Sequence, residues 1–139
     1  MHLTISNPHD WDVTIEEAER IQNEYRHQVT LSPLPTAKQT SLTAVVAADR
    51  ENRILAVAVT VDLLKHVLEV AVGSANTTFP YRSGYLAFHL APAMYQALAR
   101  LNWVGNVILV SGHGLSHPRR FGLASHLGVL LDLPTIGCA

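Results

Sequence analysis

The densest group of side chains that could do chemistry lies between residues 111 and 122, which read Ser-Gly-His-Gly-Leu-Ser-His-Pro-Arg-Arg-Phe-Gly. Glycine lets backbone N–H groups approach a ligand, arginine offers a fork of donors, and a helix N-terminus favours anions. Because a helix is predicted from about Pro118 to Leu131, we expect an anion-binding loop here. The alternative is that the glycines only form the turn and the arginines are solvated. The expected contacts are Gly112, Gly114, Arg119 and Arg120.

Three side chains of this loop are candidates for catalysis, namely Ser111, His113 and His117. Imidazole exchanges protons near neutral pH, so we expect the two histidines to hydrogen-bond or transfer protons and to steady negative charge. A His-x-x-x-His pair can also bind zinc when both rings lie on one helix face. The flanking glycines disfavour a helix there, and no Cys or carboxylate lies close in sequence. We therefore predict no metal at this loop.

A second group lies between residues 79 and 89, which read Phe-Pro-Tyr-Arg-Ser-Gly-Tyr-Leu-Ala-Phe-His. Tyr81 and Arg82 stand in a turn bounded by proline and glycine, where they could stack on a flat ring and hold its charge. Alternatively, Tyr85 and Phe88 belong to the core and only Tyr81 is exposed. Tyr81 and Arg82 are thus candidate substrate contacts.

The composition bounds the kind of protein that carries these groups. With 139 residues, 48% hydrophobic, 15% charged and a formal charge of −1, the chain is expected to form one globular domain. That balance excludes disorder and leaves no bulk positive charge to hold nucleic acid. The sequence shows neither a membrane-spanning stretch nor a secretory signal, so we expect a cytoplasmic protein. The single cysteine, Cys138, is expected to pack in a strand, although its position permits a nucleophile.

Periodicity predicts the elements that must position these groups. Alternating apolar residues predict three consecutive strands with short links, hence an antiparallel meander, and later helices and strands alternate as in crossovers. This order predicts a mixed α/β sheet of the ribonuclease H-like type with helices on both faces. The expected elements are helix 15–29, strands 42–48, 54–61 and 64–72, a helix with Pro92 in its first turn, strand 106–110, helix 118–131 and strand 135–138.

Three runs, at 79–88, 112–128 and 134–137, closely resemble the endonuclease V family, and with the first helix the likeness covers nearly the whole chain in order. The resemblance implies a ribonuclease H-like fold and Mg²⁺-dependent cutting of nucleic acid near inosine. It also implies that the tyrosine turn separates strands and that the glycine-rich loop helps build a base pocket.

The sequence departs from the family pattern at the metal-binding carboxylates, whose places hold Val46, Leu90 and Ser111. Mg²⁺ prefers hard oxygen ligands, and Asp49 would point to the face opposite Val46. Arg82-Ser83 also replaces the usual apolar residue and proline of the wedge. We therefore expect no metal-dependent cleavage and no cofactor.

These departures lead to an expectation about function. We expect a catalytically degenerate scaffold, repurposed as a subunit of a heteromeric biosynthetic enzyme that acts on a small molecule with a phosphate, sulfate or carboxylate group. The alternatives are a non-cutting protein that binds inosine in nucleic acid and a purely structural partner subunit. Residues 1–139 are expected to form a single shortened domain. Because its apolar strands suit a sheet buried on both sides, we also expect a homodimer or a protein partner.

Overall fold

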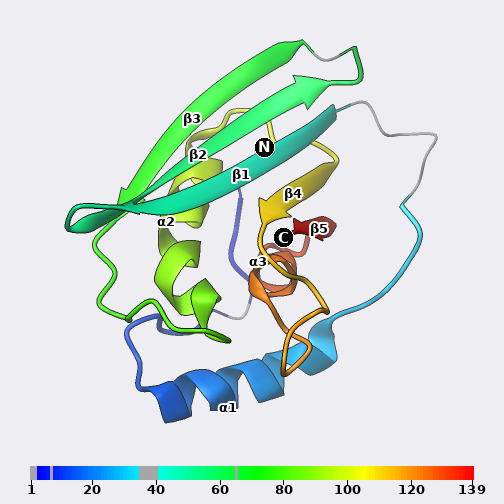
Figure 1. The fold of residues 1–139 in the computed structure, drawn as a ribbon. Coiled ribbons are helices and arrows are strands. Elements are labelled where there is room, and N and C mark those ends of the chain that lie inside the picture. Colours follow the sequence, from blue (N-terminus) through cyan, green and yellow to red (C-terminus); the bar gives the residue numbers. More distant parts are fainter. Residues whose placement is uncertain (1–2, 7, 35–40, 65) are drawn as a thin grey trace.

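The computed structural model describes residues 3–6, 8–34, 41–64 and 66–139, which form one mixed sheet and the helices packed on it (Figure 1). The order of the elements agrees with the order predicted from the sequence. The elements are α1 (Ile15–Tyr25), the 3-10 turn η1 (Arg26–Gln28), β1 (Ser41–Arg50), β2 (Arg53–Asp62), β3 (Val67–Ala75), α2 (Leu86–Arg100), β4 (Val107–Ser111), α3 (Leu123–Leu131) and β5 (Thr135–Cys138).

The five strands lie in the order β3-β2-β1-β4-β5. The three long strands pair antiparallel, whereas β4 runs parallel to both β1 and β5. This arrangement follows from the connections, because short links join the first three strands and helices join the later ones. The carboxyl end of β4 therefore delivers the glycine-rich segment to one edge of the sheet.

One face of the sheet is buried against α2 and α3, and α1 packs beneath them (Figure 1). Gly73 on β3 lets the backbone of α2 come close, since a Cβ there would lie 2.8 Å from the Ala93 carbonyl oxygen. Ala93 and Ala97 are fully buried at this crossing. A second cluster, built around Phe88 and Phe121, joins α1 to α3 and to the turn before α2.

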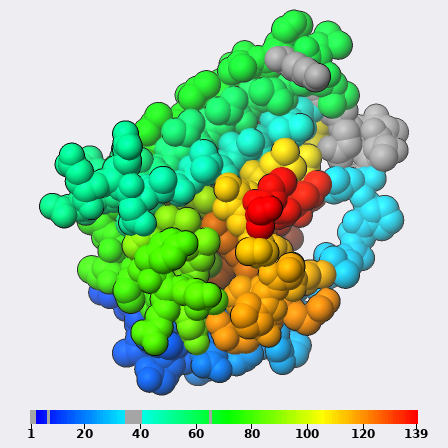
Figure 2. All heavy atoms as spheres, in the orientation of Figure 1, coloured from blue at the N-terminus to red at the C-terminus, as the bar shows by residue number. Residues whose placement is uncertain are grey.

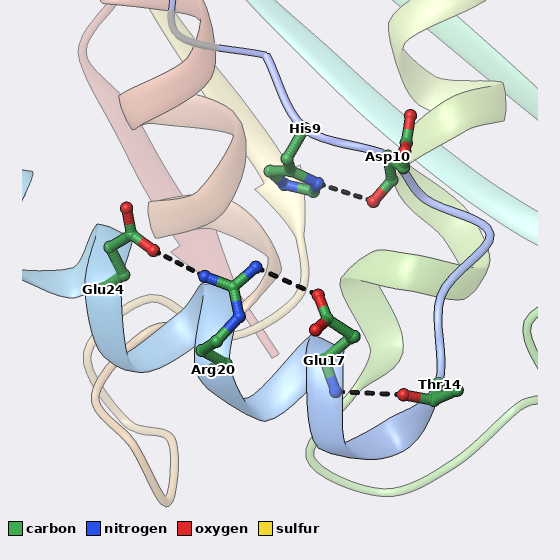
Figure 3. A network of polar contacts seen from close by, with 6 residues as sticks. All are labelled: His9, Asp10, Thr14, Glu17, Arg20 and Glu24. Atoms are coloured by element: carbon green, nitrogen blue, oxygen red, sulfur yellow. Dashed lines mark hydrogen bonds and ion pairs between the residues drawn. The ribbon is translucent and has the colours of Figure 1, made fainter.

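The first helix begins as predicted, because the Thr14 hydroxyl accepts the Glu17 N–H at 3.2 Å (Figure 3). Arg20 then donates to Glu17 and Glu24 along the exposed face. A residue near the chain start is also tied down, because the Ser6 N–H donates to the Leu130 carbonyl oxygen.

Two helices and one strand begin elsewhere than predicted. α2 begins at Leu86, so Pro92 lies inside it and not in its first turn. α3 begins at Leu123 and not at Pro118, because Arg120 has a left-handed φ of 55°, which a helix cannot contain. The third strand begins at Val67 because the Asp62 carboxylate holds a turn by accepting two backbone N–H groups. Lys65, inside the predicted strand, lies outside the described residues.

The other face of the sheet, here called the outward face, carries no helix among the described residues, so the helices expected there are not seen in that part of the chain. At the ends of the strands this face carries Arg50, Arg53 and Ser74. Ten of its other residues on β1–β3 are apolar, and Val46, Val57, Val70 and Val72 expose 36–56% of their surface. They are Leu42, Ala44, Val46, Leu55, Val57, Val59, Val61, Val67, Val70 and Val72.

The last strand, predicted at Thr135–Cys138, is found there, but Cys138 is exposed and not packed as expected. The reason is that β5 is an edge strand lying at the surface (red in Figure 2). No helix in the described residues is long and apolar enough to cross a membrane.

Candidate functional site

A cavity of about 200 Å³ opens between the turn that precedes α2 and the loop that follows β4. Both sequence groups singled out for chemistry contribute to its walls, although they lie far apart in the chain. α1 closes it from below through Gln22. The lining residues are Gln22, Tyr81, Arg82, Ser83, Gly84, Leu86, Ala87, His113, His117, Phe121, Gly122 and Leu123.

The two walls are held together at one atom, the carbonyl oxygen of Gly84. It accepts hydrogen bonds from Gln22 Nε2 at 2.9 Å, His117 Nε2 at 2.8 Å and Arg119 Nη2 at 2.8 Å. Gly84 can present its carbonyl in this way because its φ is 86°, a conformation that favours glycine. The cavity therefore has a shape fixed by hydrogen bonds from two other segments.

His117 is one of these braces. Its Nε2 donates to Gly84, and its Nδ1 accepts the backbone N–H groups of Arg119 and Phe121 at 3.1 and 3.3 Å. These contacts assign the neutral ring with the proton on Nε2. Burial lowers the pKa of His117, and the nearby Arg119 charge lowers it further, while the bond to Gly84 works against both. A proton-transfer role for His117 stays a prediction, and the contacts show a ring used to join two walls.

Arg119 is built into the same network. Its Nε donates to Gln22 Oε1 at 2.5 Å, and its guanidinium carbon lies 4.5 Å from the centre of the Tyr85 ring. With the bond to Gly84, two of its nitrogens serve protein acceptors, so its predicted role in anion binding remains untested. Arg120, in contrast, is exposed and forms no ion pair within the described residues.

At the start of α3 the loop already uses several of its own backbone N–H groups, and anion binding there stays a prediction. The Ala124 N–H donates to the His113 carbonyl oxygen and the Gly122 N–H to the Gly114 carbonyl oxygen, both at 2.9 Å. The loop thus caps the helix with its own backbone. Gly112 is likewise occupied, because its N–H donates to the Cys138 carbonyl oxygen at 2.9 Å.

The remaining predicted residues differ in where they lie. His113 is exposed and lines the cavity, whereas Ser111 is exposed at the end of β4 outside the lining. Tyr81 is 69% exposed at the mouth, beside the exposed Arg82. As the alternative interpretation held, Tyr85 and Phe88 are core residues.

The sequence did not predict the roles of Gln22 and Gly84. It also did not predict the contacts of His89, whose ring packs against Tyr81. His89 Nδ1 contacts the Phe79 carbonyl oxygen and its Nε2 contacts Asp49 Oδ1, both at 2.7 Å, which anchors the turn to β1. The Tyr81 ring packs edge-on against His89. One available signal was Gln22 itself, an amide on the apolar face of an amphipathic helix.

A second, shallower cavity of about 300 Å³ adjoins the same loop on its other side. It is lined by Arg26 and His27 from η1, by Arg120, and by the apolar residues Val29, Leu31 and Leu115. Arg26 and Arg120 thus place positive charge beside the loop that also lines the first cavity.

A mixed sheet ordered β3-β2-β1-β4-β5, with a ligand-sized cavity built from loops at its edge, defines a protein of the ribonuclease H-like α/β class. The endonuclease V family model matches residues 23–139. The chain belongs to the endonuclease V family. Endonuclease V of Nostoc sp. strain PCC 7120 is 42% identical over 99% of this chain and 63% of its own length.

Solved structures agree with this assignment. The Streptomyces avermitilis endonuclease V structure superposes with a TM-score of 0.85 at 39% identity, covering 99% of this chain and 61% of that one. The Ciona intestinalis enzyme in complex with a 24mer DNA that contains an inosine followed by a ribo-adenosine gives 0.80 at 27% identity, covering 88% and 56%. The chain therefore spans about 60% of the length of the relatives it matches.

These relatives overturn one expectation. The hypothesis of a catalytically degenerate subunit of a heteromeric biosynthetic enzyme is wrong, because proteins about 40% identical over nearly the whole chain are named endonuclease V. That hypothesis rested on three residues that depart from the family pattern, Val46, Leu90 and Ser111. The sequence similarity to endonuclease V extends over nearly the whole chain, including both walls of the cavity, and is the stronger evidence.

The side chains at the family's metal positions do not fit Mg²⁺. Val45 on β1 pairs with Val110 on β4, and Val46 and Ser111 are the residues that follow this pair. Leu90 lies in the core and is 6% exposed. Val46 and Leu90 have no donor atom and Ser111 offers one neutral hydroxyl, whereas Mg²⁺ requires hard oxygen ligands. Asp49 points towards α2, as predicted, where it binds His89. The described residues contain no group of three or more His, Cys, Asp or Glu side chains that could hold a metal ion.

Proposed function

We propose that this chain performs endonuclease V-type recognition of nucleic acid, in which the cavity between the two walls receives an unstacked base, that of inosine, from a strand. The support is the Ciona intestinalis relative, whose structure holds DNA containing an inosine. Family membership and the two motif runs that line the cavity extend the idea to this chain. The proposal concerns recognition, and no hydrolytic step is derived from the residues at the metal positions.

The observation that carries the proposal is the fixed cavity at Gly84. A flat base needs parallel walls and a few polar groups that do not move when it enters. The bonds that converge on the Gly84 carbonyl hold the turn and the loop in place from three directions. The exposed His113 ring, which lines the cavity, then stands where it can meet polar atoms of the base.

The surroundings of the cavity suit a strand of nucleic acid. Tyr81 stands exposed at the mouth and offers a ring on which a neighbouring base can stack, an interaction of about 1–3 kcal/mol per base. Arg82 on one side, and Arg26 with Arg120 on the other, provide positive charge for phosphates. Because the whole chain has a formal charge of −1, binding must depend on this local arrangement.

The test compares fluorescence anisotropy of single strands that differ only in one base, inosine or adenosine, in buffer without divalent cations. We expect tighter binding of the inosine strand, and loss of about tenfold in affinity for Tyr81→Ala through lost stacking. Trp103→Ala is the matched control, because Trp103 is 56% exposed but does not line the cavity. Equal affinity for both strands, or equal losses in the two variants, would contradict the proposal.

A further inference from the structure

His89 is a buried polar side chain that lies outside the cavity and joins three segments of the chain beside it. It stands in the first turn of α2 and is 7% exposed. Its Nδ1 donates to the Phe79 carbonyl oxygen at 2.7 Å, since a carbonyl oxygen only accepts. On the opposite side of the ring, Nε2 lies 2.7 Å from Asp49 Oδ1, at the end of β1. The two contacts together fix the orientation of the ring.

The ring of His89 is the surface against which Tyr81 packs. The two rings are inclined at 85° with their centres 5.6 Å apart, and Tyr81 has no other ring contact within the described part of the chain. Tyr81 is 69% exposed, so most of its surface meets solvent. The direction in which the Tyr81 ring stands at the mouth of the cavity therefore depends on His89.

The backbone carries the same restraint to Tyr81. The Phe79 carbonyl belongs to the peptide bond with Pro80, and the proline ring fixes φ of that residue at about −65°. Pro80 alone separates the anchored carbonyl from Tyr81. By holding the Phe79 carbonyl, His89 thus limits where the backbone can place Tyr81.

Asp49 supports this arrangement from outside the cavity. Its side chain is 53% exposed, and it is absent from the cavity lining. Because Asp49 is paired with Ile54 in the sheet, its carboxylate offers His89 a contact that stays in place. A ring held only by the Phe79 carbonyl can tilt about that bond, whereas a second contact on the opposite nitrogen prevents the tilt.

We propose that His89, held by Asp49, is a positioning residue for nucleic-acid binding, which keeps the Tyr81 ring in the orientation that stacks on a base of the strand. The inference rests on the proposed function, in which Tyr81 supplies that stacking surface. A ring that is oriented before the strand arrives loses less conformational freedom on binding, so the affinity is higher. Neither His89 nor Asp49 lines the cavity, and the effect requires no contact between them and the nucleic acid.

The test uses Asp49→Ala, which removes the support of His89 without changing a lining residue of the cavity. We expect binding of the inosine strand to weaken by about threefold to tenfold, as for one side chain that must be ordered on binding. In a chain that already carries Tyr81→Ala, the same change should cause no further loss, because the ring that it orients is gone. Asp49→Asn, whose amide can still meet Nε2 of His89, should restore most of the affinity.

The matched control is Asp62→Ala. It removes the same charge from another carboxylate that contacts a histidine, since Asp62 Oδ2 lies 3.2 Å from His66 Nδ1, and neither residue lines the cavity. We expect Asp62→Ala to leave the affinity for the inosine strand unchanged. This control separates the loss of a carboxylate from the loss of the contact with His89.

A second readout does not involve nucleic acid. In NMR spectra of the chain with labelled tyrosine rings, Tyr81→Ala identifies the Tyr81 signals by their disappearance. We expect these signals to move towards those of a solvated tyrosine in Asp49→Ala and to stay in place in Asp62→Ala. If the wild-type chain binds inosine and adenosine strands equally, the proposed function fails, and the NMR signals still decide whether Asp49 orients Tyr81.

Circular dichroism shows which variants fold. If Asp49→Ala does not, Asp49→Ser provides the same test, because its hydroxyl is too short to reach His89. An unchanged affinity in the folded variant overturns the inference, and so does an equal loss with and without the Tyr81 ring, which would show a purely structural role. Tyr81 signals that do not move overturn it as well.

Discussion

At the scale of single residues, the buried amide of Gln22 decides whether the cavity keeps its shape. Gln22 is 1% exposed and joins Gly84 to Arg119 with both ends of its amide. Gln22→Met keeps the side-chain volume but removes one hydrogen bond from the Gly84 carbonyl oxygen and one from Arg119 Nε. We therefore expect a loss of about 1–3 kcal/mol in the free energy of unfolding. Denaturant titration measures it, with the exposed Gln28→Met as the control. Equal stability of the two variants would show that solvent replaces the amide.

A pair of histidines predicts how stability depends on pH. His126 is fully buried, and its Nε2 lies 2.6 Å from Nε2 of His9, whose Nδ1 donates to the Asp10 carbonyl oxygen (Figure 3). His9 Nε2 must then accept, so both rings are neutral, and His126 Nδ1 has no hydrogen-bond partner among the residues that the structure describes. Burial lowers the pKa of His9 and lowers that of His126 further.

The direction of the effect follows from linkage. A histidine whose pKa is lowered by folding binds more protons when unfolded, so its contribution is complete above the unfolded pKa of about 6.5 and is lost as the pH falls below it. We expect His126→Phe to flatten the fall in unfolding free energy between pH 7 and pH 5. His27→Phe, at an exposed histidine of η1, should leave the slope as in the wild type. An unchanged slope in His126→Phe would contradict the assignment of neutral rings.

At the scale of elements, the crossing of α2 over β3 depends on one missing side chain. Gly73→Ala places a Cβ against the helix backbone, 2.8 Å from the Ala93 carbonyl oxygen, so the helix must shift away from the sheet. We expect a loss of about 1–3 kcal/mol, the usual cost of overpacking a core. Gly114→Ala is the matched control, because its Cβ would meet only Ser125 Oγ at an ordinary 3.6 Å. Thermal unfolding of both variants compares them directly, and similar midpoints would show that α2 moves without cost.

The elements also show how much the sequence could predict. The apolar runs predicted the strands and their sequence along the chain. They did not predict which face is covered, because both faces were expected to be covered, whereas Ala56 and Ala58 are buried and Val57 between them is 36% exposed. The start of α3 depended on the left-handed φ of Arg120, which no residue preference signals. The turn and the loop were predicted as sites, but their junction was not, because the Gln22–Gly84 bond spans 62 positions of the chain.

At the scale of the whole molecule, the net charge is only −1, but some arginines lie close to the cavities. This distribution predicts how nucleic-acid binding responds to salt. Arg26 and Arg120 lie beside the second cavity, whereas Arg50 and Arg53 lie at the turn between β1 and β2. Each cation that neutralises a phosphate of a single strand contributes about 0.7 to the slope of log affinity against log salt concentration. We expect Arg26→Gln and Arg120→Gln each to lower the slope by about that amount, and Arg50→Gln and Arg53→Gln to leave it unchanged. Anisotropy titrations of the inosine strand at several salt concentrations measure the slopes. Equal reductions at both ends of the molecule would mean that the strand is held by diffuse charge, and the cavity would then lose its role as the point that orients it.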